Sequence, residues 1–153
     1  MNAEYVNPFL KASIEVLRMA AQIVLNISKP FLSDSPNATE SLNIVVGITG
    51  EIRGQAVISM STDMAKIIAS NMMMGMPVLE IDEMAQSALS ELGNMIMGNS
   101  ATLFCNSGIN IDITTPTLVL GEYSSNLSGQ TTTITVPLEG PQGHININIS
   151  MKD

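Results

Sequence analysis

The sequence predicts an α+β fold in which long helices pack against a mostly antiparallel β-sheet, giving a two-layer domain. Two stretches, residues 4–25 and 82–104, place apolar side chains at helical spacing. Short runs that alternate or are rich in β-branched residues follow each stretch, separated by turns that contain glycine. A chain of 153 residues that is 45% apolar has the size and composition of one domain with a large core, so we expect a single domain over residues 1–153.

The first half of the chain is expected to form a helix, a loop and a hairpin. The apolar spacing predicts the helix over residues 4–25, and Pro30 stops it from continuing. Residues 33–37 contain only Ser, Asp, Pro and Asn and predict an exposed loop. The runs 42–49 and 55–61 then predict two antiparallel strands joined by a tight turn.

The second half is expected to contain a short helix, a long helix and three strands. Thr62 or Asp63 is suited to cap the short helix, which runs to about Met74 before Gly75 and Pro77 stop it. The three strand-like runs are residues 112–123, 130–138 and 144–151. In the last of these, isoleucines alternate with Asn and Ser, so we expect one face to be buried and the other to be wet.

The turn regions of the two halves resemble each other weakly. GEIRGQAVISM at residues 50–60 is loosely mirrored by GPQGHININISM at residues 140–151, and a long helix precedes each segment. The chain is therefore interpreted either as two copies of a helix-plus-hairpin unit about a pseudo-twofold axis, or as two hairpins that share ordinary turn chemistry. The residues alone leave both interpretations open.

The long helix over residues 82–104 is the segment around which the other elements are arranged. Asp82 is placed to cap its first turn, where Glu83 adds favourable negative charge. At about 100° per residue, its apolar side chains form one arc, predicted to face the core. Asn99 lies within this arc and is predicted to be a buried structural amide. The arc consists of Met84, Ala85, Ala88, Leu89, Leu92, Met95, Ile96 and Leu103.

Glu91 and Asn94 lie about 120° around the helix axis from the centre of this arc. They are separated by roughly 60° around the axis and point away from the apolar arc. Small residues surround them, namely Ser87, Ser90, Gly98 and Ala101. Taken alone, such residues are more typical of a solvated helix face than of a site, although asparagine is an unfavourable residue in a helix interior. This pair is the candidate functional site of the chain.

Composition and charge exclude several classes of function. The net charge is −8 and the six basic residues are scattered, which excludes a nucleic-acid-binding patch. The same charge disfavours anionic membrane surfaces, and no apolar run approaches the roughly 20 residues of a membrane span. The first residues do not resemble a signal peptide, so a cytoplasmic location is expected. Glu80, Asp82 and Glu83 are interpreted as complementary charge at a helix start, so no metal site is predicted.

The segment ELGNMIMGNSA at residues 91–101 resembles the characteristic helix of the CheC/CheX family of chemotaxis phosphatases. The resemblance extends over nearly the whole chain in order and spacing. It includes Asn7-Pro8-Phe9, the glycines Gly50 and Gly54, and ITTPT at residues 113–117 followed by Gly121. It is strongest for the CheX branch, and it reverses the interpretation of Glu91 and Asn94 from a solvated face to a functional pair.

The resemblance implies an aspartyl-phosphate phosphatase. The expected partner is a phosphorylated CheY-like receiver domain, a response regulator that would carry the Mg²⁺ ion itself, so this chain needs no cofactor of its own. Asn94 is expected to orient the attacking water and Glu91 to dock the partner through one of its lysines. A pseudo-twofold fold and a homodimer formed through sheet edges are also implied.

Two further expectations concern the number of sites and the alternative functions. By position, the counterpart of the pair on the first helix is Glu15 and Arg18, where arginine cannot supply a carbonyl acceptor. One working site is therefore expected, as in the CheX branch. The alternative function is a non-catalytic module of the same fold that binds a receiver domain or a chemotaxis adaptor, and a purely structural dimer is a third possibility.

Overall fold

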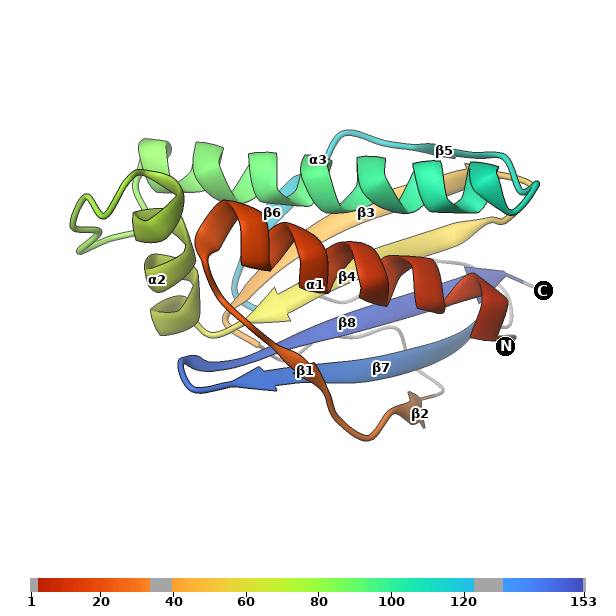
Figure 1. Ribbon diagram of the computed structural model, residues 1–153, viewed down its shortest axis with the longest axis horizontal. Coiled ribbons are helices and arrows are strands. Elements are labelled where there is room, and N and C mark those ends of the chain that lie inside the picture. The colour runs from red at the N-terminus through yellow and green to blue at the C-terminus, as the bar shows by residue number, and fades with distance from the viewer. Residues whose placement is uncertain (1–2, 34–39, 123–130, 153) are drawn as a thin grey trace.

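The computed structural model describes residues 3–33, 40–122 and 131–152 (Figure 1). Its helical elements are η1 (Ala3–Tyr5), α1 (Asn7–Ala21), α2 (Thr62–Met72) and α3 (Glu83–Asn106). Its strands are β1 (Asn26–Ile27), β2 (Phe31–Ser33), β3 (Leu42–Gly50), β4 (Gly54–Met60), β5 (Ile111–Ile113), β6 (Thr117–Leu120), β7 (Thr131–Gly140) and β8 (Gly143–Lys152).

The described elements form two layers, with helices α1 and α3 lying across one face of an eight-stranded sheet (Figure 1). All the strand pairs are antiparallel, in the order β1-β7-β8-β4-β3-β5, while β2 also pairs with β7 and β6 with β3. The α+β fold predicted from the sequence is thus confirmed. None of the described helices combines the length and the apolar character needed to cross a lipid bilayer.

The two halves of the chain are related by a pseudo-twofold axis, as one of the two interpretations predicted. Each half contributes a long helix, two short strands and a hairpin in the same order. The short strands of each half pair with the hairpin of the other, since β1 and β2 join β7 while β5 and β6 join β3. The hairpins meet at the centre, where β4 pairs with β8 and Ile58 faces Ile147.

Helices α1 and α3 run antiparallel and meet over the buried face of the sheet (Figure 1). The rings of Phe9 and Phe104 make an edge-to-face contact with centroids 5.2 Å apart, which joins the start of α1 to the end of α3. The core side of the sheet presents side chains such as Ile44, Ile58 and Ile147, which are almost completely buried. The sheet and both long helices therefore share one hydrophobic core.

The first helix is shorter than predicted, and strands occupy part of the segment that follows it. Helix α1 ends at Ala21 because Gln22 adopts a left-handed conformation with φ of 52°. Ile23 and Leu25 are buried beyond the helix end, which explains why their apolar spacing extended the prediction. Strands β1 and β2 were not predicted, because two or three residues carry too little alternation to be recognised. Residues 34–37 of the expected loop lie outside the described residues.

Two boundaries also differ in the remaining elements. The cap of α2 is Ser61, whose hydroxyl accepts a hydrogen bond from the backbone N–H of Met64 at 3.1 Å, rather than Thr62 or Asp63. The single strand expected over residues 112–123 is divided into β5 and β6. The division lies near Thr114, whose hydroxyl accepts a bond from the backbone N–H of Gly47 at 2.8 Å. Residues 123 and 130 at the ends of the predicted strands lie outside the described residues.

The polar face of β8 is buried, and the prediction of a wet face was wrong. Thr135 donates a hydrogen bond to the Asn148 carbonyl oxygen at 2.7 Å, and the Asn148 amide donates to the Ser59 hydroxyl at 2.9 Å. Ser59 in turn donates to the Asn43 carbonyl oxygen at 2.6 Å, and the Asn43 amide donates to the backbone oxygen of Gly121 at 2.7 Å. This network crosses four neighbouring strands and satisfies the polar groups internally, so the face does not need water.

Candidate functional site

The long helix α3 begins as the sequence predicts. Asp82 is its N-cap, and the carboxylate accepts a hydrogen bond from the backbone N–H of Ala85 at 2.9 Å. The side-chain amide of Gln86 donates to the backbone oxygen of Ile81 at 3.0 Å, which ties the first turn to the segment before it. From this anchored start the helix continues without interruption to Asn106. The candidate residues Glu91 and Asn94 are thus held on a regular, rigid element.

The core face of α3 is rotated around the helix axis relative to the predicted apolar arc. Met84 and Asn99, placed in the arc by the sequence, are exposed, so the prediction of a buried Asn99 was wrong. Gly93 explains the rotation, because a Cβ atom there would lie only 2.8 Å from Ile44 Cγ2. The absence of a side chain at Gly93 therefore allows the helix to approach the sheet closely at this position. The buried residues are Ala85, Leu89, Leu92, Gly93, Ile96, Met97, Ser100 and Phe104.

Glu91 and Asn94 both point away from this core face and are exposed. Within the described part of the chain, neither side chain has a hydrogen-bond or ion-pair partner. Their Cα atoms are separated by about 4.5 Å along the axis and roughly 60° around it, so both side chains reach the same patch of surface. A carboxylate and a carboxamide are therefore presented side by side and remain available to another molecule.

The surface around Glu91 and Asn94 is formed by small side chains and is not obstructed by large ones. Ser87 and Gly98 are exposed small residues on the same face of α3, and Ser90 and Ala101 are small and half-buried beside it. A Cβ atom built on Gly98 would have no heavy atom within 4 Å, so the space above this residue is open. A folded domain has room to approach the pair closely without meeting a large side chain.

The chemistry of the pair suits recognition of a polar reaction centre. An exposed carboxylate forms charge-assisted hydrogen bonds with a cationic side chain, preferentially lysine or arginine. A carboxamide accepts a hydrogen bond through its oxygen and donates through its nitrogen, so Asn94 is able to contact a water molecule and an anionic oxygen together. Within the described residues, no group of three or more His, Cys, Asp or Glu side chains could hold a metal ion.

The counterpart of the pair lies on α1, where Glu15 and Arg18 occupy the equivalent position in the other half. Glu15 and Glu91 lie equally far from the first residues of their helices, Asn7 and Glu83. Arg18 has five N–H donors but no acceptor, so it cannot accept a hydrogen bond from water as an amide oxygen does. We therefore still expect only one functional pair, Glu91 and Asn94 on α3.

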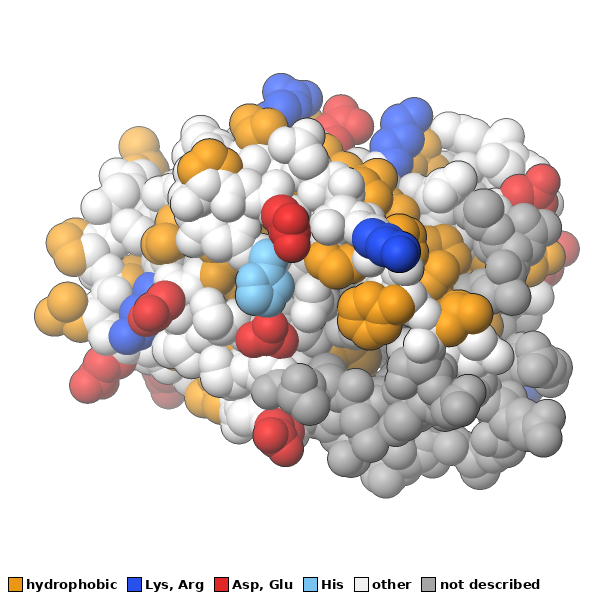
Figure 2. Space-filling model, turned by 90° about the horizontal axis from the view of Figure 1, so that it is seen from below, with side chains coloured by type: hydrophobic (Ala, Val, Ile, Leu, Met, Phe, Trp, Pro, Cys, Tyr) orange, Lys and Arg blue, Asp and Glu red, His pale blue; other side chains and the backbone are white. Residues whose placement is uncertain are grey.

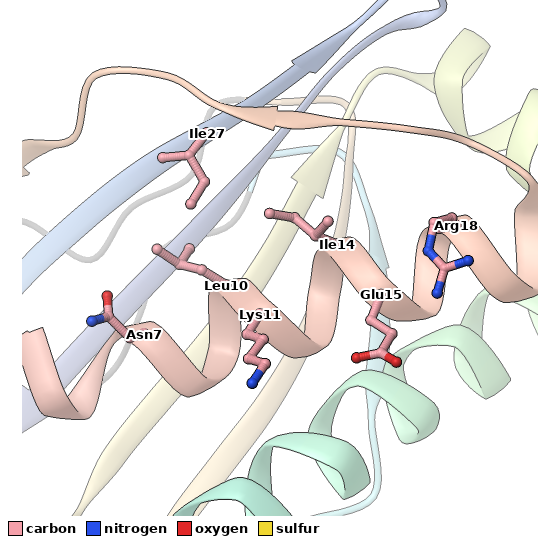
Figure 3. A pocket seen from close by; sticks show the side chains of 7 residues that line it. All are labelled: Asn7, Leu10, Lys11, Ile14, Glu15, Arg18 and Ile27. Atoms are coloured by element: carbon pink, nitrogen blue, oxygen red, sulfur yellow. The ribbon is translucent and has the colours of Figure 1, made fainter.

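A hollow of about 520 Å³ adjoins this counterpart (Figure 3). Leu10 and Ile14 of α1 point toward Ile27 of β1 and form its apolar part, whereas Lys11 and Glu15 point away from β1. The surface beside Glu15 is thus hollowed and lined partly by large apolar side chains. It differs from the low, small-residue surface around Asn94, although the two helices are related by the pseudo-twofold axis.

The structure also reveals exposed apolar side chains that the sequence did not single out. Figure 2 shows hydrophobic side chains gathered on the face of the molecule that carries β1 and β2. Ile27, Phe31 and Leu32 are 53%, 54% and 68% exposed there. The available signal was the pair Phe31-Leu32 directly after Pro30, but without a predicted strand it could not be assigned to a sheet edge.

Comparison with known proteins gives matches along most of the chain. The family model described as Chemotaxis phosphatase CheX matches residues 42–139. The CheY-P phosphatase CheX of Thermotoga maritima is 38% identical over 121 residues, which cover 79% of this chain and 78% of that protein.

Solved structures match over a still larger share. A CheC-like superfamily protein from Shewanella sp. PV-4 is 27% identical, with a TM-score of 0.87 and coverage of 100% of both chains. A chain of the CheX–CheY–BeF3–Mg²⁺ complex from Borrelia burgdorferi is 28% identical, with a TM-score of 0.79, covering 97% of this chain and 98% of that chain. The family model, the sequence relative and the solved structures therefore all point to CheC-like and CheX proteins.

Proposed function

This chain belongs to the CheX family of chemotaxis phosphatases, and we propose that it hydrolyses the aspartyl phosphate of a CheY-like response regulator in the cytoplasm, ending a chemotaxis signal. The observation that supports the proposal most directly is the exposed pair Glu91 and Asn94 on the low surface of α3. Neither side chain forms a hydrogen bond or an ion pair with a described residue, so both are available to enter the partner's reaction centre.

Asn94 supplies the group that positions the attacking water. Its carbonyl oxygen accepts a hydrogen bond from the water, and its amide nitrogen donates to a phosphoryl oxygen. Water then forms the new O–P bond in line with the breaking bond between phosphorus and the partner's aspartate oxygen. The products are inorganic phosphate and the free aspartate, so positioning is the main contribution that this chain makes.

Glu91 supplies docking energy and alignment. Its carboxylate forms a charge-assisted hydrogen bond with a lysine of the receiver domain close to the phosphorylated aspartate. Because Glu91 and Asn94 are held on the same rigid helix, this contact places the Asn94 amide at the phosphoryl group. The Mg²⁺ ion belongs to the receiver domain, and this chain contributes no cofactor of its own.

The proposal is tested by mixing the purified protein with a phosphorylated receiver domain and following the release of phosphate. Glu91→Ala is expected to raise the KM for the receiver about tenfold or more, since it removes a charge-assisted hydrogen bond at the docking surface. The matched control is Glu15→Ala, which removes the equivalent acid of α1 and is expected to leave the rate unchanged.

Two results would count against the proposal. An unchanged KM for Glu91→Ala would remove Glu91 from the docking surface. A complex that forms with the receiver while the phosphate lifetime stays constant would instead identify a non-catalytic binding module, which is the alternative function for this fold.

We also propose that the protein is a homodimer formed through the β1–β2 edge. Phe31 and Leu32 lie on the short edge strand β2 and are 54% and 68% exposed. An apolar strand exposed at a sheet edge tends to pair with another chain. A second copy that pairs with this edge would bury them. The opposite edge, formed by β5 and β6, exposes fewer large apolar side chains among the described residues, with Leu120 as its example.

The dimer is tested by sedimentation velocity. Phe31→Glu combined with Leu32→Glu is expected to convert the dimer to a monomer, because two carboxylates would be buried without partners at the interface. Leu120→Glu on the opposite edge is the matched control and should leave the dimer intact. If the control variant dissociates instead, the interface lies at the β5–β6 edge.

A further inference from the structure

The segment between α2 and α3, together with the first turn of α3, exposes a second group of large apolar side chains. Met74 is 98% exposed, Leu79 is 84% exposed and Met84 is 58% exposed, and Met76 beside them is also exposed. The connection between α2 and α3 lies at one end of the molecule, on the left in Figure 1. Large apolar side chains grouped in this way mark a surface that another molecule covers.

Hydrogen bonds at the end of α2 give this segment a defined shape. Met74 and Gly75 both have positive φ angles, of 60° and 84°. The backbone N–H of Gly75 donates to the oxygen of Ser70 at 2.8 Å, and that of Met76 donates to the oxygen of Met73 at 3.2 Å. A methionine seldom adopts a left-handed conformation, so these bonds hold Met74 outward against a local conformational cost.

The same segment borders a groove of about 350 Å³ that reaches the first turn of α3. Met76, Val78, Leu79 and Met84 give the groove an apolar lining, and Glu80 and Asp82 add carboxylates to it. The groove therefore fits an apolar side chain that is accompanied by lysine or arginine. Methionine side chains suit such a surface because they adapt their shape to the group that they contact.

The groove is continuous with the surface that carries Glu91 and Asn94. Met84 and Glu91 are two helical turns apart, so they lie about 10 Å apart along α3 and only about 20° apart around it. A protein interface of ordinary size covers about 800 Å² on each partner, a patch roughly 28 Å across. A domain centred between Glu91 and Asn94 therefore extends to Met84 and the groove beside it.

We infer that this groove, bounded by Met76, Leu79 and Met84, is a second docking point for the receiver domain, which inserts an apolar side chain flanked by basic residues. The inference rests on the proposed function, because the receiver is the occupant that Glu91 and Asn94 bring to this face. Contact at the groove adds affinity for the receiver without touching the reacting atoms. Leu79 and Met84 are specificity-determining residues in this arrangement, whereas Asn94 acts on the phosphoryl group.

Steady-state kinetics of receiver dephosphorylation test the groove separately from the reaction centre. Leu79→Ser combined with Met84→Ser is expected to raise the KM for the phosphorylated receiver about tenfold while kcat stays unchanged. Both side chains are exposed, so the variant should retain the circular dichroism and thermal unfolding of the wild type. Met19→Ser, which replaces a methionine that is 62% exposed at the end of α1, is the matched control and should change neither constant.

Methyl NMR of the methionines gives an independent measurement. Adding the receiver activated with BeF3⁻ and Mg²⁺ is expected to shift the methyl signals of Met76 and Met84 and to leave that of Met19 in place. An unchanged KM for the double variant, with no shift at Met84, would overturn the inference. A change of oligomeric state in the double variant, with an unchanged KM, would overturn it too and assign the groove to a second copy.

The outcome for Asn94→Ala keeps the two proposals distinguishable. If that variant retains full activity, the proposed role of the Glu91 and Asn94 pair fails, and the groove inference fails with it. If it loses activity while the groove variants keep the wild-type KM and Met84 does not respond to the receiver, only the groove inference is wrong.

Discussion

Replacing Asn94 with alanine is expected to lower kcat for receiver dephosphorylation by about 100-fold or more, the usual effect of removing one positioning hydrogen-bond group. The substitution removes both the acceptor that orients water and the donor that contacts the phosphoryl oxygen. Affinity for the receiver should change little, because Glu91 and the surrounding surface remain. The measurement is single-turnover decay of the phosphorylated receiver, together with titration of the BeF3⁻-activated receiver to obtain Kd.

Asn99→Ala is the matched control for this variant. Asn99 is also an exposed asparagine of α3, but it lies about 140° from Asn94 around the axis. Both substitutions replace a poor helix former with alanine, so neither is expected to destabilise the helix. Equal loss of activity in the two variants would show that the effect belongs to the helix as a whole. Unchanged decay with Asn94→Ala would exclude this residue from the reaction.

Replacing Gly98 with tryptophan is expected to weaken receiver binding by about 100-fold, because a large side chain then stands where the partner approaches. Gly98 is exposed, and a Cβ atom there would meet no heavy atom within 4 Å. The new side chain therefore projects into solvent, and tryptophan is a better helix former than glycine, so the variant should fold. Titration with the activated receiver measures the loss, and thermal unfolding verifies the fold.

Gly98→Ala separates the effect of bulk from the effect of losing glycine. It is expected to keep activity and to raise the free energy of unfolding by up to about 1 kcal/mol, the difference in helix propensity. Gly93→Ala is expected to lower the free energy of unfolding instead. Its Cβ atom would lie 2.8 Å from Ile44 Cγ2, which is too close for the packed core. Wild-type affinity for Gly98→Trp would show that the receiver docks elsewhere.

The two groups of exposed apolar side chains have different roles in these proposals. Phe31 and Leu32 lie on edge strands, where a second copy gains both backbone hydrogen bonds and apolar contact. Leu79 and Met84 line the groove beside the start of α3, where we propose that the receiver docks. A dimer through the β1–β2 edge is therefore compatible with receiver binding at α3, and each interface is tested by variants that leave the other unchanged.

Several features were predictable because they depend on residues close together in the chain. Helical spacing located α3, and Asp82 was recognised as its cap, since a cap bonds to an N–H three residues away. The separation of Glu91 from Asn94 placed both on one exposed helix face. Alternation and turn residues located the two hairpins, although the resemblance between their turns could not by itself distinguish duplication from common turn chemistry.

Other features depend on contacts between distant segments, and the sequence did not reveal them. The core face of α3 is set by how closely Gly93 approaches Ile44, so the predicted apolar arc was rotated and Asn99 was wrongly placed inside. The Asn and Ser residues of β8 are buried because polar side chains of neighbouring strands, such as Ser59, satisfy them. Strands as short as β1 exist only because β7 offers them hydrogen bonds.

The order of the residues was enough to place an acid and an amide outward on one helix, because helix geometry repeats every few residues and needs no distant partner. Which side of that helix is buried was decided by the folded chain. The close approach of Gly93 to Ile44, and the sheet edge that β1 and β2 form on β7, arise where segments far apart in sequence pack together. Packing of this kind follows from contacts that local sequence patterns do not encode.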